Sequence, residues 1–148
     1  MPIDESDIAV HRTLVNRWIE AFNEHNVSVI VTLYAGNAEL FDPTMKHPRR
    51  GRKEIERWFA KRFQSMPSIT YIPLYQFFNE AQAAVTWTVS GKTPRLLGLP
   101  WFSRPFQVEG VSIITFHDGL IQKQRGYYDH LSLVEQILPP FKLLPTRL

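Results

Sequence analysis

The spacing of the apolar residues changes part-way along the chain, and this change limits the possible folds. Before Pro67 most apolar residues recur three or four positions apart, which predicts amphipathic helices around one short strand. From Ile69 onward they alternate with polar residues, which predicts a run of antiparallel strands. Helices followed by such a run are typical of an α+β domain with its helices on one side of a sheet. The length of 148 residues suits one domain, 1–148.

The first two helices have clear start and stop signals. Asp4 or Ser6 can cap the first helix, which ends before Asn26. Asn26 can then cap a short second helix that runs through Tyr34 and is stopped by Gly36. The apolar stripe of the first helix consists of Ile8, Leu14, Val15, Trp18, Ile19 and Phe22.

One short strand and a third helix complete the N-terminal half. The strand covers residues 38–42 and is closed by Pro43. The helix begins near Gly51 and is ended by Pro67. The short C-terminal helix is expected from Leu131 to Leu138, before two prolines.

The C-terminal half is predicted to be a meander of strands. These cover residues 69–78, 85–90, 105–117 and 120–128, and Asp118-Gly119 is a strong hairpin turn between the last two. Pro73 predicts that the first of them lies at a sheet edge or contains a bulge. The loop 91–104 holds many apolar residues, so we expect it to cover other parts of the protein.

Composition excludes several classes of function. The chain has no cysteine, which excludes disulfides, a thiol nucleophile and cysteine metal sites. A net charge of +3 is too small to define a nucleic-acid binder. No apolar run is long enough for a membrane helix, and the acidic start is not a secretory signal, so we expect a cytoplasmic protein without membrane or nucleic-acid partners. The basic run at Arg49, Arg50, Arg52 and Lys53 is either a solvated loop or a phosphate site.

Aromatic residues make up 13% of the chain, which indicates an aromatic core, an apolar pocket or a dimer face. A curved sheet with helices on its concave side forms a cone, and the open end of a cone is a natural apolar pocket. Tyr34, Trp87, Trp101 and Tyr127 are candidate walls of such a pocket, although aromatic residues at these spacings are also typical of a core.

Three segments in order resemble the nuclear-transport-factor-2-like superfamily, and within it the SnoaL-like polyketide cyclases and ketosteroid isomerases. They are WIEAFNEHNVSVIVTLYAGNAELFDP, RRGRKEIERWF and FHDGLIQKQRGYYDHLSLVEQI. The resemblance covers nearly the whole chain. It implies a cone-shaped α+β barrel with a strongly curved, mainly antiparallel sheet. It also implies a homodimer packed through the sheet, a pocket for a small apolar ligand, and chemistry without metal or organic cofactor.

Asp42 is the first candidate for a catalytic residue. Alternation places it on the same face as Leu40, toward the interior, where a carboxylate suits a general base. It also falls on the base position of the ketosteroid isomerases that the segment resembles. Their oxyanion-hole tyrosine is replaced by Trp18 and their protonated aspartic acid by Ser112, so steroid isomerisation is not expected. The alternative is that Asp42 only forms a turn before proline.

Asp129 is the second candidate, because it matches the acid–base aspartate that SnoaL-like cyclases carry before their last helix. It shares a strand face with Arg125 and Tyr127, and this trio could supply a base and a donor. Asp129 could instead cap the last helix, and Arg125 could be a charge facing solvent or a dimer partner. The five histidines show no metal-ligand spacing.

The sequence thus favours a cofactor-independent acid–base enzyme of isomerase, cyclase or hydratase type, acting on a small apolar carbonyl compound. The alternative is a protein of the same superfamily that binds or carries a small hydrophobic ligand without catalysis. A further alternative is an adaptor that binds another protein through the exposed sheet.

Overall fold

A six-stranded, strongly curved and unclosed sheet is the main element of the fold. The structure is a computed structural model that describes residues 4–93 and 103–137. The helices are α1 (Glu5–Asn23), α2 (Val27–Thr32), α3 (Gly51–Ser65) and α4 (His130–Ile137). The strands are β1 (Tyr34–Phe41), β2 (Arg49–Arg50), β3 (Thr70–Phe78), β4 (Gln82–Lys92), β5 (Pro105–His117) and β6 (Leu120–Tyr128).

The sheet has the strand order β2-β1-β6-β5-β4-β3, and all neighbouring pairs are antiparallel except β1 and β6. The four strands β3 to β6 follow the predicted meander, and Asp118 and Gly119 turn the chain with positive φ angles of 50° and 71°. β3 is an edge strand, and its register shifts between Pro73 and Tyr75. The prediction from Pro73, an edge strand or a bulge, is therefore confirmed, and the strand has both an edge position and an irregular register.

The helices begin at the expected residues. The Asp4 side chain accepts a hydrogen bond from the Ser6 backbone N–H at 2.9 Å, and Asn26 caps α2 in the same way through Val29. The predicted end of the second helix is wrong, because α2 stops at Thr32 and Tyr34 starts β1. The Leu33 carbonyl accepts a bond from the Ile121 backbone N–H, so pairing with β6 takes over from the helix there.

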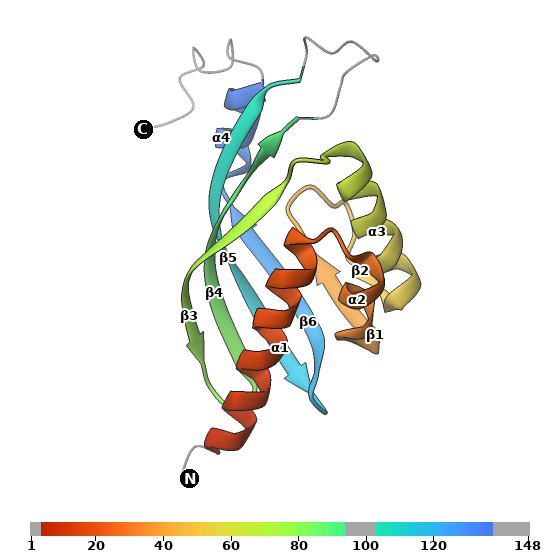
Figure 1. The fold of residues 1–148 in the computed structure, drawn as a ribbon, viewed down its shortest axis with the longest axis vertical. Helices are drawn as coiled ribbons and strands as arrows, with labels where there is room; N and C mark the ends of the chain where they lie inside the picture. Colours follow the sequence, from red (N-terminus) through yellow and green to blue (C-terminus); the bar gives the residue numbers. More distant parts are fainter. Residues whose placement is uncertain (1–3, 94–102, 138–148) are drawn as a thin grey trace.

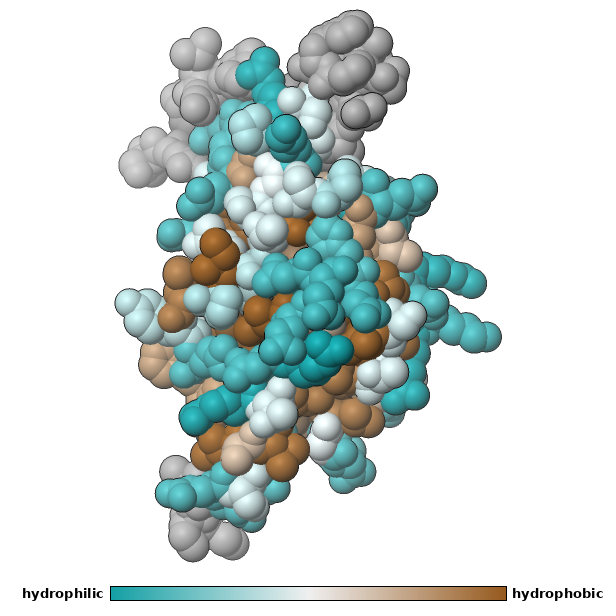
Figure 2. All heavy atoms as spheres, in the orientation of Figure 1, coloured by the Kyte–Doolittle hydropathy of each residue, from teal (hydrophilic) through white to brown (hydrophobic). Residues whose placement is uncertain are grey.

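Helices α1, α2 and α3 all lie on the concave side of the sheet, as Figure 1 shows. The core fills the space between these layers. It includes a cluster of aromatic rings. The ring centroids lie 6.1 Å apart for Trp18 and Phe59, 5.1 Å for Phe22 and Phe63, and 6.4 Å for Tyr34 and Phe59, and the first two pairs meet edge to face. Figure 2 shows hydrophilic side chains over α1 and projecting from the α3 side, and hydrophobic residues reaching the surface near β3.

A bulge in β6 decides which of its residues face the helices. Phe116 pairs with Ile121 whereas Thr115 pairs with Lys123, so Gln122 is an extra residue in the ladder. Ile121 is fully buried, and after the bulge the buried position moves to Gln124. Residues 124, 126 and 128 therefore face the interior, whereas 125 and 127 face outward.

Some sequence expectations lie outside the described residues. They concern most of the apolar loop, including Trp101, and the segment from 138 to 148. No helix in the described part of the chain has the length and hydropathy needed to span a bilayer.

Candidate functional site

A cavity opens between the concave face of the sheet and helices α1 and α3. Its volume is about 110 Å³, somewhat below the roughly 150 Å³ of an apolar cavity that holds benzene. Its apolar and aromatic wall residues include Trp18, Phe22, Leu40, Trp58, Phe59, Tyr71, Trp87, Phe106 and Val108. Its polar lining comes from Asp42, Arg62, Ser112, Gln124 and Tyr128. A cavity of this kind suits a small, mainly apolar molecule with one or two polar groups.

Asp42 directly follows the last residue of β1, and its two carboxylate oxygens differ in their surroundings. Oδ1 accepts hydrogen bonds from the Thr44 backbone N–H at 2.8 Å, the Thr44 hydroxyl at 2.6 Å and the Tyr128 hydroxyl at 3.0 Å. Oδ2 accepts none from the residues that the structure describes. The side chain is 25% exposed. The carboxylate is thus held by one oxygen, while the other is available to accept a proton.

Tyr128 and Arg62 are the polar neighbours of Asp42. Burial raises the pKa of the Tyr128 phenol well above its ordinary value, and the charge of Asp42 raises it further, while Arg62 opposes both effects. Tyr128 therefore stays protonated and donates to Asp42. The Arg62 guanidinium lies 3.8 Å from Oδ1 of Asp42 and hydrogen-bonds the Thr44 hydroxyl at 3.4 Å. Its side chain is only 18% exposed, so this ion pair is screened less than a surface pair.

A buried hydrogen-bond chain supports one wall of the cavity. The Trp18 indole N–H donates to the Tyr34 hydroxyl at 2.9 Å, and that hydroxyl donates to Oε1 of Gln124 at 2.5 Å. Burial raises the pKa of Tyr34 far above its ordinary value, so the phenol remains a donor. Because the Trp18 N–H is used within this chain, it does not replace the missing oxyanion-hole tyrosine.

The opposite wall is fixed by Trp87. Its indole N–H donates to the Ser112 hydroxyl at 2.9 Å, and Ser112 also hydrogen-bonds Tyr71. Burial raises the pKa of Tyr71 despite that bond. The Trp87 ring passes close to Gly110, where an added Cβ would lie 2.6 Å from it and 2.5 Å from the Tyr127 carbonyl oxygen. Only glycine allows this close approach without a shift of the ring or the strand.

The structure separates the predicted site residues into two groups. Asp42, Trp18, Trp87 and Ser112 line the cavity, and Tyr34 lies buried behind the wall. The other residues lie outside the cavity or outside the described residues, and they are Asp129, Arg125, Tyr127 and Trp101.

Asp129, Arg125 and Tyr127 do not line the cavity, because the β6 bulge turns their side chains outward. Asp129 is exposed, and its Oδ1 accepts from the Ser132 backbone N–H at 3.1 Å, which caps α4. The Arg125 guanidinium lies 4.2 Å from the centroid of the Phe41 ring and 5.6 Å from that of Tyr127. Tyr127 is 48% exposed.

Four hydrogen-bonding residues of the site were not singled out from the sequence. They are Arg62, Tyr71, Gln124 and Tyr128. Arg62 could have been found from its position four residues after Trp58 on one helix face, beside the expected end of the strand. Tyr128 and Gln124 could not, because their inward position depends on the bulge.

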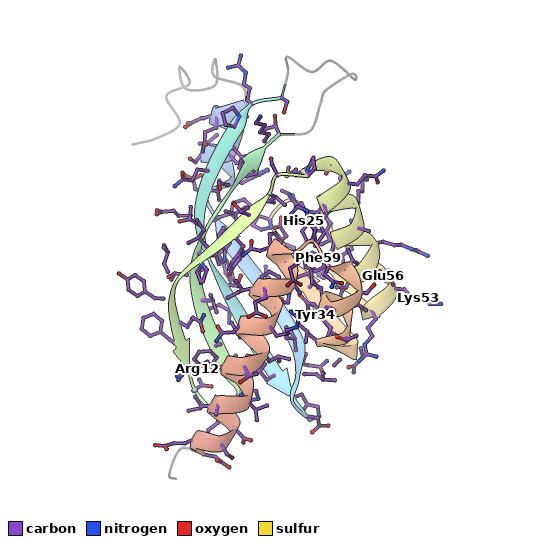
Figure 3. The ribbon with its side chains drawn as sticks, viewed as in Figure 1. Arg12, His25, Tyr34, Lys53, Glu56 and Phe59 are labelled. Carbon is purple, nitrogen blue, oxygen red and sulfur yellow. The ribbon has the colours of Figure 1, made fainter. Side chains whose placement is uncertain are left out.

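Figure 3 shows Tyr34 and Phe59 directed into the space between sheet and helices, and Lys53 and Glu56 projecting away from α3.

Within residues 4–93 and 103–137, no group of three or more histidine, aspartate or glutamate side chains is arranged to hold a metal ion.

Residues 15–124 match the SnoaL-like domain family, which is more than half of the chain. The chain belongs to this family. No curated protein matches the sequence of this SnoaL-like domain.

Solved structures with the same fold are numerous. A hypothetical protein from Catenulispora acidiphila with a ketosteroid isomerase-like fold, in complex with trimethylamine, is 20% identical with a TM-score of 0.74, over 89% of this chain and 97% of that one. A protein from Shewanella denitrificans, named provisionally as a SnoaL-like polyketide cyclase, is 15% identical with a TM-score of 0.75, over 86% and 96%. TsrD from Streptomyces laurentii is 19% identical with a TM-score of 0.73, over 93% and 98%. These likenesses establish the fold of the SnoaL-like domain, which is the one that its sequence predicts.

Proposed function

We propose that the protein is a cofactor-independent acid–base enzyme that removes a proton from a small apolar carbonyl compound, with Asp42 as the general base. The observation that carries the proposal is the position of Asp42 in the cavity wall, with Oδ1 held by two residues and Oδ2 without a donor among the described residues. A fixed carboxylate in an apolar cavity is suited to attack a C–H bond next to a carbonyl group.

The proton transfer that we propose uses only groups of the site and of the substrate. Oδ2 of Asp42 takes the proton, the C–H bonding pair moves toward the carbonyl, and negative charge develops on the substrate oxygen. Protonation of Asp42 weakens its hold on the Tyr128 hydroxyl, which then becomes a donor for that oxygen. The Arg62 guanidinium, 3.8 Å from Asp42, would stabilise the same charge. Returning the proton to a different carbon gives an isomer. Attack of the carbanion on a second carbonyl carbon of the same molecule gives a ring, because the C=O bonding pair moves to that oxygen and the oxygen takes the proton from Asp42.

Proton exchange with solvent tests the base without knowledge of the true substrate. Small cyclic ketones such as cyclohexanone, incubated with the protein in deuterated buffer, should lose their α-proton NMR signal faster than in buffer alone. Asp42→Asn should reduce the enzymatic exchange rate by about a thousandfold, within the usual range for loss of a general base.

The variant Asp129→Asn tests whether Asp42 or Asp129 is the general base. Asparagine is a good helix cap, so α4 should be retained, and exchange should continue if Asp42 is the base. Loss of exchange in Asp129→Asn with retention in Asp42→Asn would instead make Asp129 the base, with Arg125 as its partner.

The second candidate function is a carrier of a small hydrophobic ligand. It is favoured by the mostly apolar cavity lining and by the engagement of the Trp18 and Trp87 N–H groups inside the protein. Binding of cyclohexanone without any acceleration of exchange would support this function over the enzyme.

We propose that the outer face of the sheet forms a homodimer. Cross-strand pairing aligns Tyr75, Thr86, Val111 and Tyr127 in one row across four strands. Tyr75 and the neighbouring Phe77 are 67% and 63% exposed, which is unusual for aromatic residues on a sheet. Light scattering at micromolar concentration should give twice the monomer mass, and a monomer would contradict the proposal.

A cytoplasmic location is likewise proposed from the sequence.

A further inference from the structure

A groove rich in positive charge lies directly beside the cavity. Its volume is about 490 Å³, and it lies between one face of α3 and the chain from Thr44 to Arg49. Four cationic side chains line it, together with one carboxylate and one indole ring: Arg49, Arg57, Lys61, Arg62, Glu54 and Trp58. We call this surface the basic groove.

The spacing along α3 brings these side chains together. Arg57 and Lys61 are four residues apart, and so are Trp58 and Arg62, so both pairs lie on neighbouring ridges of one helix face. Like charges at this spacing disfavour a helix. The helix dipole favours a cation in the last turn, where Arg62 lies, but this does not account for Arg49, which comes from β2.

The positive charge of the basic groove is mostly uncompensated. Among the described residues, Arg49, Arg57 and Lys61 have no carboxylate within 4.0 Å. Arg62 is paired with Asp42, but that carboxylate also accepts hydrogen bonds from Thr44 and Tyr128. One oxygen of Glu54 accepts the Arg50 backbone N–H at 2.6 Å, so this carboxylate is partly used at the start of α3. A surplus of cations gathered in a concave surface attracts anions.

Trp58 and Arg62 join the basic groove to the cavity, because both residues line both spaces. Arg62 lies 4.5 Å and Arg49 lies 5.8 Å from the centroid of the Trp58 ring. The ring therefore holds two guanidinium groups next to the cavity mouth. Within the described part of the chain, the Arg62 guanidinium donates one hydrogen bond, to Thr44, which leaves most of its N–H donors for a ligand.

We propose that the ligand of this protein carries a multiply charged anionic group, of which an organic phosphate is the simplest, and that this group binds in the basic groove while the apolar part enters the cavity. The inference rests on the proposed function of the cavity and adds the chemical class of its ligand. Four cations against one carboxylate fit a dianion better than a single negative charge.

Calorimetric titration with four probes tests the inference. Phenyl phosphate supplies an apolar ring and a dianion, phenol the ring alone, inorganic phosphate the dianion alone, and benzoate the ring with one charge. We expect phenyl phosphate to bind at least tenfold more tightly than each of the others, and to weaken as ionic strength rises.

Two lysines of α3 provide a matched pair of variants. Lys61→Gln should weaken the binding of phenyl phosphate about fivefold, which is the usual effect of losing one exposed charged contact, and leave the binding of phenol unchanged. Lys53→Gln removes the same charge from a side chain that projects away from the sheet, and it should change neither affinity (Figure 3). The double variant Arg57→Gln with Lys61→Gln should weaken the binding of phenyl phosphate roughly twentyfold.

The possible failures are distinguishable. Equal binding of phenol and phenyl phosphate, or equal effects of Lys61→Gln and Lys53→Gln, would overturn the inference and leave the proposed function intact. Inorganic phosphate or benzoate binding as tightly as phenyl phosphate would also overturn it, since the ring or the second charge would then contribute nothing. No binding of any ring compound would contradict the proposed function of the cavity and the inference with it.

Discussion

Replacement of Tyr34 by phenylalanine should destabilise the protein through a single oxygen atom. The Tyr34 hydroxyl is fully buried, accepts from the Trp18 indole and donates to Gln124. Tyr34→Phe keeps the ring packing and leaves both partners without that bond. Each buried group left unpaired costs roughly 1–3 kcal/mol, so two of them give about 2–6 kcal/mol. Trp18 and Gln124 also line the cavity, where water can reach them, so we expect about 3 kcal/mol.

Urea denaturation followed by circular dichroism measures this loss, which corresponds to a fall in Tm of roughly 6–12 °C for a chain of this size. The matched control is Tyr75→Phe, because Tyr75 is 67% exposed in the single chain and its hydroxyl makes no hydrogen bond within the described residues. Phenylalanine also keeps the aromatic ring that Tyr75 contributes to the proposed dimer face. That variant should stay within about 0.5 kcal/mol of the parent.

A second substitution tests the origin of the loss. Adding Gln124→Leu to Tyr34→Phe removes the unpaired acceptor, so the double variant should be more stable than Tyr34→Phe alone. Equal stabilities of Tyr34→Phe and Tyr75→Phe, or no gain from Gln124→Leu, would refute the reasoning that the buried chain stabilises this wall.

Two further predictions concern the cavity wall and its phenols. Gly110→Ala should cost about 1–3 kcal/mol of unfolding free energy and change the tryptophan fluorescence, because the new Cβ would clash with Trp87, whereas Gly36→Ala, whose Cβ would meet nothing within 4 Å, should have little effect. Tyr34, Tyr71 and Tyr128 have raised pKa values in the folded state, so they bind their protons more tightly than the unfolded chain does, whose tyrosines titrate near pH 10. Their contribution to stability should be complete below about pH 10 and decline above it, and phenolate absorbance from these three residues should appear only with unfolding.

Most of the fold could be predicted from local chemistry. The caps at Asp4 and Asn26, the turn at Asp118-Gly119 and the edge position implied by Pro73 each depend on one or two neighbouring residues, and all agree with the structure. The end of α2 could not be predicted in this way. Leu33 and Tyr34 pair with residues near 121, which are far away in the sequence.

The candidate site could be predicted only where the alternation of a strand is uninterrupted. On β1 the step from Leu40 to Asp42 keeps one face, so the cavity position of Asp42 follows from the sequence. On β6 both faces carry polar and aromatic residues, so hydrophobicity does not identify the inner one. The bulge at Gln122 then reverses the alternation that Ile121 implies, and it brings Gln124 and Tyr128 inward instead of Arg125 and Tyr127.

The bulge in β6 also decides which of two sets of polar side chains this chamber receives. Deletion of Gln122 would make the pairing with β5 regular and keep Gln124 and Tyr128 inside, because Ile121 and Lys123 already pair with adjacent residues of β5. A regular strand of unchanged length would instead turn Arg125 and Tyr127 inward, in place of the glutamine and the phenol that holds Asp42. The character of the chamber therefore depends on one irregularity of the backbone as much as on the residues that the strand contains.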